Sequence, residues 1–128
     1  MNFRFVTKTV HAYLDYPVAL SLMITPFLLG IGRSNPVALW LSLATGVAAF
    51  ALTFLTDHET GVIRVLSYWL HVAVDRIVGA VFVVALFVFG FEGLDALYDW
   101  ANGAAALLVT FVLNAPEGER NTLAAARA

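Results

Sequence analysis

Four long apolar segments, separated by short polar ones, determine what this chain can fold into. They cover residues 10–31, 37–56, 66–90 and 94–113. About 20 apolar residues in helical conformation cross the hydrocarbon core of a bilayer, so segments of this length predict transmembrane helices. A water-soluble domain of 128 residues, of which 61% are hydrophobic, would be unable to bury so much apolar surface. We therefore expect an all-α protein, a four-helix transmembrane bundle that forms a single membrane domain.

The two halves of the chain are related by a repeat with an offset of sixty residues. Residues 1–60 align without a gap on residues 61–120, and the matches include Arg, His, Asp, Trp and Glu, which are scarce in this composition. The identical pairs are Arg4/Arg64, His11/His71, Asp15/Asp75, Val18/Val78, Phe27/Phe87, Gly30/Gly90, Trp40/Trp100, Ala44/Ala104 and Glu59/Glu119. We interpret this pattern as two tandem repeats followed by a polar tail, 121–128. Because each repeat has two spans, the repeats should be parallel, around a pseudo-twofold axis along the membrane normal.

Each repeat also carries the same stripe of ionisable side chains. Arg64, His71 and Asp75 are spaced so that, at about 100° per residue, they lie within roughly 40° of one another on a helix. The first repeat has the same spacing sixty residues earlier. Ionisable residues inside membrane spans are costly and by default indicate a functional site. The candidate site residues, which we expect to face the bundle interior, are His11, Asp15, His71 and Asp75.

Several interpretations of this stripe are open, and the first is a structural polar lock. In a lock, each histidine pairs with the aspartate of its own repeat or of the other repeat and holds the helices in register. The polar network would extend to the helix ends, where Arg4 and Arg64 pair with an acidic side chain of the segment between the repeats or of the second repeat's end. The candidates are Asp57, Glu59 and Glu119.

The second interpretation is a divalent-metal site. Two histidines and two aspartates from two helices form a ligand set suited to zinc, manganese or iron. Paired His-x-x-x-Asp motifs on two spans are also similar to the metal site of cation-diffusion-facilitator zinc transporters. A third interpretation is a b-type haem held by His11 and His71, which the carboxylates one turn deeper disfavour. A proton or small-solute path is a further alternative.

Two other ionisable residues have simpler expectations. We expect His58 to be a solvated loop histidine, with contact to a metal at the helix ends as the alternative. Arg76 should extend toward the lipid headgroups or pair with a neighbouring acidic side chain.

Composition narrows the classes of function. The chain has no cysteine, which excludes thiolate metal sites and disulfides. Its net charge of −2 does not favour nucleic-acid binding. No nucleophile elbow, phosphate-binding loop or thiol is present, so we expect no enzyme. Our first hypothesis for the function is a structural or accessory role in the membrane. The alternative hypothesis is metal binding or transport. The partners expected are the lipid bilayer and either a second copy of the chain or a larger membrane complex.

The distribution of positive charge predicts the orientation in the membrane. Most Lys and Arg residues flank the ends of the spans that carry the histidines, whereas the opposite ends carry one arginine and several acids. The positive-inside rule therefore predicts a multi-pass protein of the cell inner (plasma) membrane with both termini in the cytoplasm. The residues on the predicted inner side are Arg4, Lys8, Arg64, Arg120 and Arg127, and those on the outer side are Arg33, Glu92, Asp95 and Asp99.

A resemblance to a known family rests on three segments of the third span and of the polar segment before it. These are Thr56–Gly61, the motif His71-Val72-Ala73-Val74-Asp75, and Phe89-Gly90-Phe91. They resemble the SPW-repeat integral membrane proteins of bacteria and archaea. The family's Ser-Pro-Trp motif is degenerate in the first repeat, as Thr25-Pro26-Phe27, and absent from the second, which has Ala85-Leu86-Phe87. The resemblance implies a duplicated pair of spans and a membrane location, and no established activity.

Overall fold

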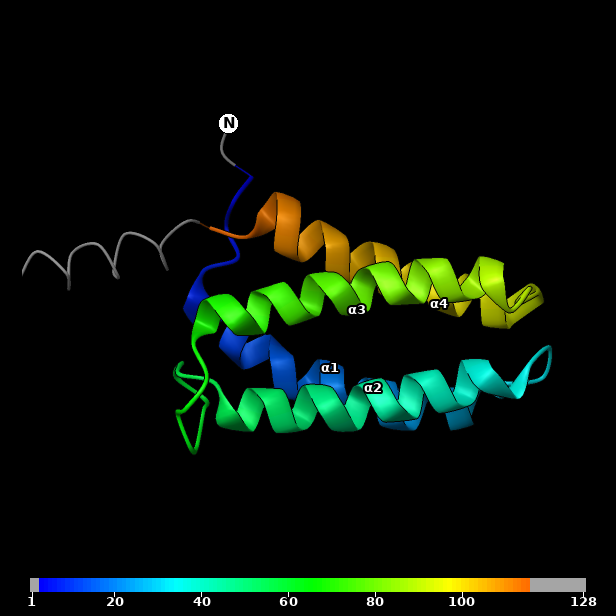
Figure 1. Cartoon of the computed structure of the whole chain (residues 1–128), viewed down its shortest axis with the longest axis horizontal. Helices are drawn as coiled ribbons and strands as arrows, with labels where there is room; N and C mark the ends of the chain where they lie inside the picture. Colours follow the sequence, from blue (N-terminus) through cyan, green and yellow to red (C-terminus); the bar gives the residue numbers. More distant parts are fainter. Residues whose placement is uncertain (1–2, 116–128) are drawn as a thin grey trace, which may run out of the picture.

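The computed structural model describes residues 3–115 of the chain and confirms the all-α fold. The described residues form four helices: α1 (Lys8–Leu29), α2 (Pro36–Leu55), α3 (Tyr68–Val88) and α4 (Gly93–Leu107), which continues into the π-helical segment η1 (Leu108–Leu113) (Figure 1). All four, with η1 counted as part of α4, are long and apolar enough to cross a membrane. The predicted polar tail, Glu119 and the last two arginines lie outside the described residues.

Short polar side chains set where the helices begin. The Thr7 hydroxyl accepts a hydrogen bond from the Val10 N–H at 3.2 Å, so α1 starts two residues before the predicted span. Sixty residues later, the Ser67 hydroxyl accepts from the Leu70 N–H at 3.2 Å and starts α3. Asn35 caps α2 in the same way, with Pro36 in its first turn.

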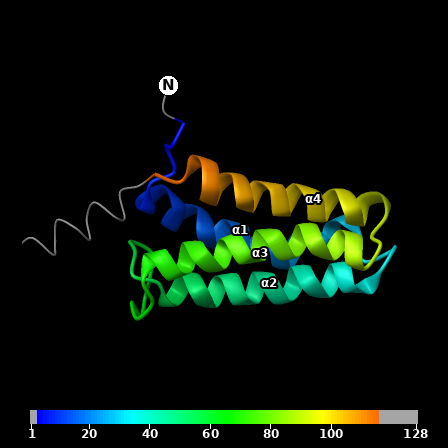
Figure 2. The same cartoon turned by 45° about the horizontal axis from the view of Figure 1, so that its top comes forward.

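The helices form two antiparallel hairpins, α1 with α2 and α3 with α4, which lie side by side (Figures 1 and 2). The N-terminal segment, the end of η1 and residues 56–67, which we call the joint, gather at one end of the bundle (Figure 1). The two hairpin turns, residues 30–35 and 89–92, gather at the other. We refer to these as the joint end and the turn end. The predicted site residues therefore lie near the joint end.

Glycines allow the helices of each hairpin to pack closely. A Cβ atom at Gly46 of α2 would lie 2.9 Å from the carbonyl oxygen of Ala19 in α1. A Cβ atom at Gly103 of α4 would lie 3.0 Å from the carbonyl oxygen of Gly79 in α3. In lipid, helix association depends on such close backbone contact between small residues. The two points of contact on α1 and α3 are sixty residues apart in the sequence.

One carboxylate joins the two hairpins at the turn end. Asp95 of α4 is 2% exposed, and it accepts hydrogen bonds from the backbone N–H groups of Gly32 and Ser34, both at 2.9 Å. It also accepts from the Asn35 N–H at 3.3 Å and from the Ser34 hydroxyl at 2.7 Å. In return, the Asn35 side chain donates to the Phe89 carbonyl of the second turn at 3.3 Å. Below these contacts, a buried apolar cluster fills the turn end: Ile31, Ala38, Ala85, Leu86, Phe91 and Tyr98.

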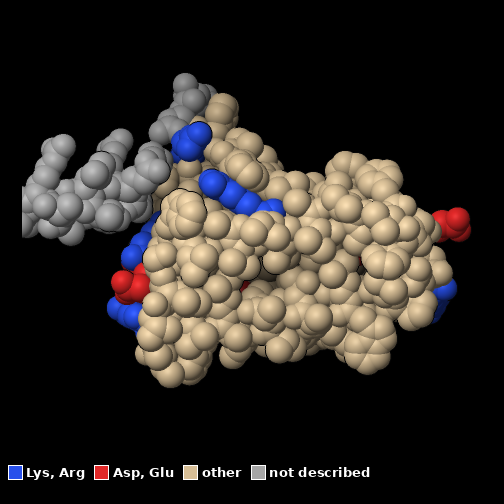
Figure 3. Space-filling model, viewed as in Figure 1, with Lys and Arg blue, Asp and Glu red and all other residues tan. Residues whose placement is uncertain are grey.

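The outer surface of the bundle is apolar. Large hydrophobic side chains such as Leu28, Trp69 and Val88 are at least 70% exposed. On the face shown in Figure 3, charged side chains gather mainly toward the two ends of the bundle. An apolar belt between charged ends matches the hydrocarbon core of a bilayer, where water is absent.

We expect Asp95→Ala to lower the free energy of unfolding by about 2–3 kcal/mol, because several N–H groups of the first turn lose a charged acceptor. Unfolding in detergent micelles, followed by circular dichroism, measures this loss. Glu92→Ala is the matched control, since Glu92 precedes the same helix, is exposed and makes no side-chain capping bond. It should change stability by less than about 0.5 kcal/mol. Equal losses in the two variants would contradict a specific role for Asp95.

Candidate functional site

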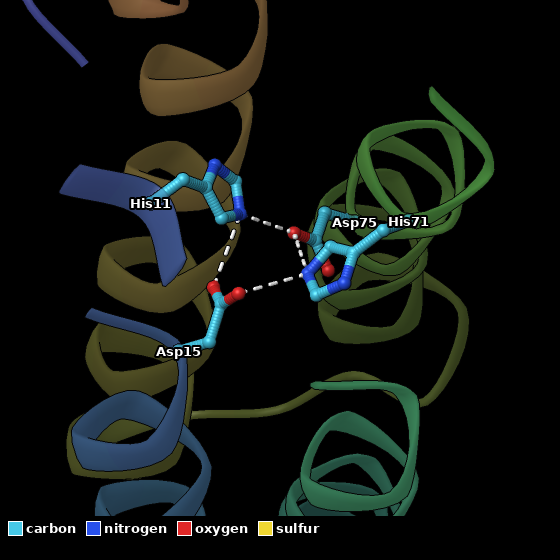
Figure 4. A group of neighbouring side chains, drawn as sticks. All are labelled: His11, Asp15, His71 and Asp75. Carbon is cyan, nitrogen blue, oxygen red and sulfur yellow. Dashed lines mark hydrogen bonds and ion pairs between the residues drawn. The ribbon is translucent and has the colours of Figure 1, made fainter. Parts of the chain in front are cut away.

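The site is built from two pairs of residues at the joint-end turns of α1 and α3. His11 and Asp15 are four residues apart on α1, and His71 and Asp75 are four residues apart on α3. This spacing puts each pair on one face of its helix, on successive turns. Figure 4 shows the four side chains pointing toward one another across the space between the two helices. The expectation that all four face the interior of the bundle agrees with this arrangement.

His11 and His71 each contact both aspartates. The Nε2 atom of His11 lies 3.1 Å from Asp15 Oδ1 and 2.8 Å from Asp75 Oδ2. The Nε2 atom of His71 lies 3.2 Å from an oxygen of each of the same two aspartates. One ligand atom from each of the four residues lies within 4.8 Å of those of the other three. The pairing is therefore both within a helix and between helices.

The four side chains differ in their exposure. The two imidazoles are almost completely buried, with 5% and 2% of the side chain exposed for His11 and His71. The carboxylate side chains are 11% exposed for Asp15 and 24% for Asp75. Asp75 is thus the member of the group that a ligand can reach most easily.

A threonine of the joint determines which nitrogen of His71 carries a proton. The Thr56 hydroxyl donates its single proton to the Leu52 carbonyl oxygen at 2.6 Å. The same oxygen lies 2.7 Å from Nδ1 of His71, so it must accept that hydrogen bond and Nδ1 must carry a proton. Nε2 of His71 therefore faces the two carboxylates either as a bare lone pair or as a second N–H. A bare Nε2 with Nδ1–H held by an oxygen is the arrangement found in metal-binding histidines.

The third histidine of the sequence also belongs to this group, which corrects our expectation of a solvated loop residue. His58 is 2% exposed, and its Nε2 lies 3.3 Å from Asp15 Oδ2. Its Nδ1 lies 3.5 Å from the Thr60 hydroxyl, which itself donates to the Ala12 carbonyl at 2.8 Å. His58 thus repeats the environment of His71, with a threonine on one nitrogen and an aspartate on the other.

The joint is held over the site by side chains of α1. The Tyr16 hydroxyl donates to the Thr60 carbonyl at 2.8 Å, and the Thr9 hydroxyl donates to the Glu59 carboxylate at 2.8 Å. The Thr9 hydrogen bond lowers the pKa of Glu59, which lies outside the spans. Through these contacts of Thr60 and Glu59, the joint covers the end of the site. The covering residues belong to a non-helical segment, so no helical period in the sequence reveals them.

The two arginines of the predicted network donate hydrogen bonds to backbone carbonyls. Arg64 donates to the carbonyl oxygens of Gly61 at 3.1 Å and Glu59 at 3.3 Å, where we had expected a carboxylate. Within residues 3–115, Arg64 forms no ion pair with Asp57 or Glu59. Arg4 donates to the Asn114 carbonyl at 3.4 Å. Backbone carbonyls at the helix ends are thus acceptors for these guanidinium groups.

The expectation for Arg76 is also corrected. Its guanidinium group donates to the Thr110 carbonyl of η1 at 2.8 Å and lies over the Phe111 ring, 4.3 Å from the ring centroid. Arg76 therefore packs against the last turns of its own hairpin. A cation over an aromatic face is stabilised by the ring quadrupole.

The geometry does not fit a haem held between His11 and His71. Their ring centroids are 5.2 Å apart, and both Nε2 atoms lie within 3.2 Å of the same oxygen of Asp75. A porphyrin between two axial histidines needs a nitrogen on each side of its plane. That space is filled here by the two carboxylates.

Comparisons of the chain with models of protein families, with curated proteins and with solved structures give no match.

We expect Thr56→Val to lower the free energy of unfolding by about 1–3 kcal/mol, because the buried Nδ1–H of His71 loses its acceptor. The matched control is Thr53→Val, since the Thr53 hydroxyl donates to the Ala49 carbonyl at 2.8 Å, as Thr56 does to Leu52. Both residues are buried and on the same helix end, but Thr53 forms no hydrogen bond to a histidine in the described chain. Chemical unfolding in micelles gives both values. If the control is destabilised as much as Thr56→Val, the hydrogen bond between Thr56 and His71 makes no specific contribution to stability.

Proposed function

We propose that this chain is an integral membrane protein that binds a divalent transition metal, zinc first among the candidates, at His11, Asp15, His71 and Asp75. One observation carries the proposal. The cluster has four short N···O contacts, but its two Nε2 atoms carry at most two protons. At most two contacts can therefore have a proton of their own. The four contacts join five atoms, because Asp15 uses Oδ1 toward His11 and Oδ2 toward His71. A cation bound to both Nε2 atoms and to one oxygen of each carboxylate would need no proton between them.

The dimensions of the cluster support a tetrahedral metal site. With metal–ligand bonds of about 2.0–2.1 Å, neighbouring ligand atoms of a tetrahedron are about 3.3–3.5 Å apart. The four N···O distances, 2.8 to 3.2 Å, are a few tenths of an ångström shorter than this, and one ligand atom from each residue lies within 4.8 Å of the other three. Small shifts of the side chains would bring these atoms to tetrahedral spacing. Two carboxylates would neutralise a divalent cation, which favours its burial in an apolar bundle. Imidazole and carboxylate ligands together are typical of zinc, manganese and iron sites.

His58 and the two threonines of the joint fit the same proposal. The threonine oxygens hold Nδ1–H of His71 and of His58, so both Nε2 atoms are oriented toward the carboxylates. Outer partners of this kind fix the tautomer of metal-binding histidines. His58 lies beside Asp15 and belongs to the joint. It could therefore bind a cation on the way between the joint end of the bundle and the four-residue site.

The structural polar lock is the second candidate function, and one observation favours it. Nδ1 of His11 is buried and has no hydrogen-bond partner in the described part of the chain. Metal binding at Nε2 of His11 places a proton on this Nδ1, which leaves a donor unpaired. In the lock, the proton is on Nε2 and is shared between Asp15 and Asp75. The lock needs no cation and only holds α1 against α3.

Asp75→Asn separates the two candidates. An amide keeps the shape of the side chain but is a poor replacement for a carboxylate ligand. Loss of a residue that only hydrogen-bonds to a metal ligand lowers metal affinity by about 10–100-fold. If Asp75 is itself a ligand, Asp75→Asn should lower the affinity for zinc by more than this. A lock should show no metal binding in either protein and lose about 1–2 kcal/mol of stability.

The measurement is zinc titration of the purified protein together with its unfolding free energy. Asp57→Asn is the control, since Asp57 is an exposed carboxylate of the joint. Unchanged affinity and unchanged stability in Asp75→Asn would exclude both candidates.

We also propose that the chain arose by duplication, that it is related to the SPW-repeat proteins and that it has an accessory role without enzymatic activity. Matched features of the two hairpins support the duplication. Thr7 and Ser67 cap the first helix of each hairpin, and a glycine with a left-handed backbone follows that helix, with φ 66° at Gly30 and 64° at Gly90. The two histidine–aspartate pairs occupy equivalent turns of these helices.

The proposed location is the cell inner membrane, with the joint end in the cytoplasm. Arg4, Lys8 and Arg64 lie at the joint end, whereas Arg33 lies at the turn end. Cytoplasmic segments carry the excess of Lys and Arg near membrane spans. A cation would then reach the site from the cytoplasm.

Reporter fusions test this orientation. A fusion after Gly32 or after Gly93 should place the reporter outside the cytoplasm, because both positions are in the turn end. A fusion at the C-terminus, Ala128, should place it inside. Alkaline phosphatase and green fluorescent protein report opposite sides and serve as controls for each other. A C-terminal phosphatase fusion that is active would reverse the proposed orientation.

A further inference from the structure

A cavity of about 620 Å³ lies between the two hairpins, and all four helices contribute to its wall. Its size is within the range of small-molecule sites, about 300–1,000 Å³. The wall is mainly apolar and includes Val18, Leu52, Val78, Phe82 and Val109. Figure 3 shows the surface hollowed between α2 and α3, with acidic atoms visible inside. Because the surrounding surface is the apolar belt, this opening faces lipid.

The charged end of the cavity is formed by the site residues. His11, Asp15, His71 and Asp75 all line it, and Asp75 is the most exposed of them. Among the described residues, both contacts of the Asp75 carboxylate are made by Oδ2. Oδ1 is therefore an acceptor without a protein donor at the end of an apolar cavity. A ligand that fits must bring a hydrogen-bond donor to this point.

We infer that the cavity binds a single-chain membrane amphiphile whose head group, an amine or a hydroxyl, donates a hydrogen bond to Asp75 while its apolar chain lies between the hairpins. Asp75 and Phe82 are seven residues apart on α3, which corresponds to about 10 Å along the helix. A chain of this length would run from the site toward the middle of the bundle.

Other occupants fit less well. Water would find polar side chains in the wall at Ser21, Thr45 and Asn102, but most of the lining is apolar and offers it no hydrogen bond. A metal ion needs the charged end alone and leaves the rest of the cavity vacant. A helix of a second copy is too wide, since an α-helix with side chains is about 10–12 Å across. An alkyl chain from the bilayer matches both the lining and the opening.

This inference does not depend on the metal proposal. A cation between the four residues would use Oδ2 of Asp75, and the amphiphile would use Oδ1. The two ligands therefore involve different atoms of the same carboxylate. Variants that fill the cavity should leave metal content unchanged, so failure of one proposal is distinguishable from failure of the other.

The experiment measures binding of decylamine and decanol to the full chain in zwitterionic lipid vesicles, by equilibrium dialysis against protein-free vesicles. Val78→Phe places a ring in the cavity from α3, and Ala105→Phe does so from α4. Val81→Phe is the matched control, since Val81 is one turn from Val78, is 44% exposed and does not line the cavity. Decanoate and decane serve as control ligands with an anionic head group and with none.

We expect saturable binding of decylamine and decanol to the native protein, with decanoate and decane at the level of protein-free vesicles. Val78→Phe and Ala105→Phe should each weaken binding on the order of tenfold, about 1.4 kcal/mol, and Val81→Phe should not. Asp75→Asn should weaken decylamine more than decanol, because it removes the charge. Equal binding of all four ligands, or equal losses in Val78→Phe and Val81→Phe, would show simple partitioning into lipid and overturn the inference. Unchanged binding in both cavity variants would overturn it as well.

Discussion

The carboxylates of Asp15 and Asp75, which lie between α1 and α3 inside an apolar bundle, are the constraint on which the rest of the structure depends. An ionised carboxylate without partners in such a place costs many kcal/mol. Asp15 and Asp75 avoid this cost because three imidazoles surround them, each within 3.3 Å of a carboxylate oxygen. The imidazoles of His71 and His58 are in turn held by threonines of the joint, which accept their hydrogen bonds. The arrangement of α1, α3 and the joint therefore follows from satisfying these polar groups.

The two hairpins are joined in different ways at the two ends of the bundle, and the cavity lies between these ends. At the turn end, Asp95 binds the opposite turn and an apolar cluster fills the space beneath it. At the joint end, the histidine–aspartate group joins the hairpins through polar contacts only. Between these ends the hairpins separate enough to leave a cavity of about 620 Å³. A bundle held at both ends can keep an open middle without losing its register.

Hydropathy and the sixty-residue repeat were sufficient to predict the helices and the four principal site residues. The reason is that spans, and side chains four residues apart on a helix, follow regular periods. His58, Thr56 and Asp95 were missed or misjudged because their contacts come from turns, whose path depends on tertiary packing. The carbonyl acceptor of Arg76 lies in a π-helical segment, which no apolar pattern predicts. One signal was present in the sequence: threonines two residues on either side of His58 mark a polar joint.

The claim that the four residues form a metal site is tested most directly by X-ray absorption at the zinc edge, on protein purified without chelators and loaded with one equivalent of zinc. The account predicts a four-coordinate ion with two imidazole nitrogens and two carboxylate oxygens at about 2.0–2.2 Å. In protein with glutamine at both His11 and His71, the imidazole scattering should disappear. A spectrum identical to that of zinc in buffer, or one unchanged by the double substitution, would contradict the account.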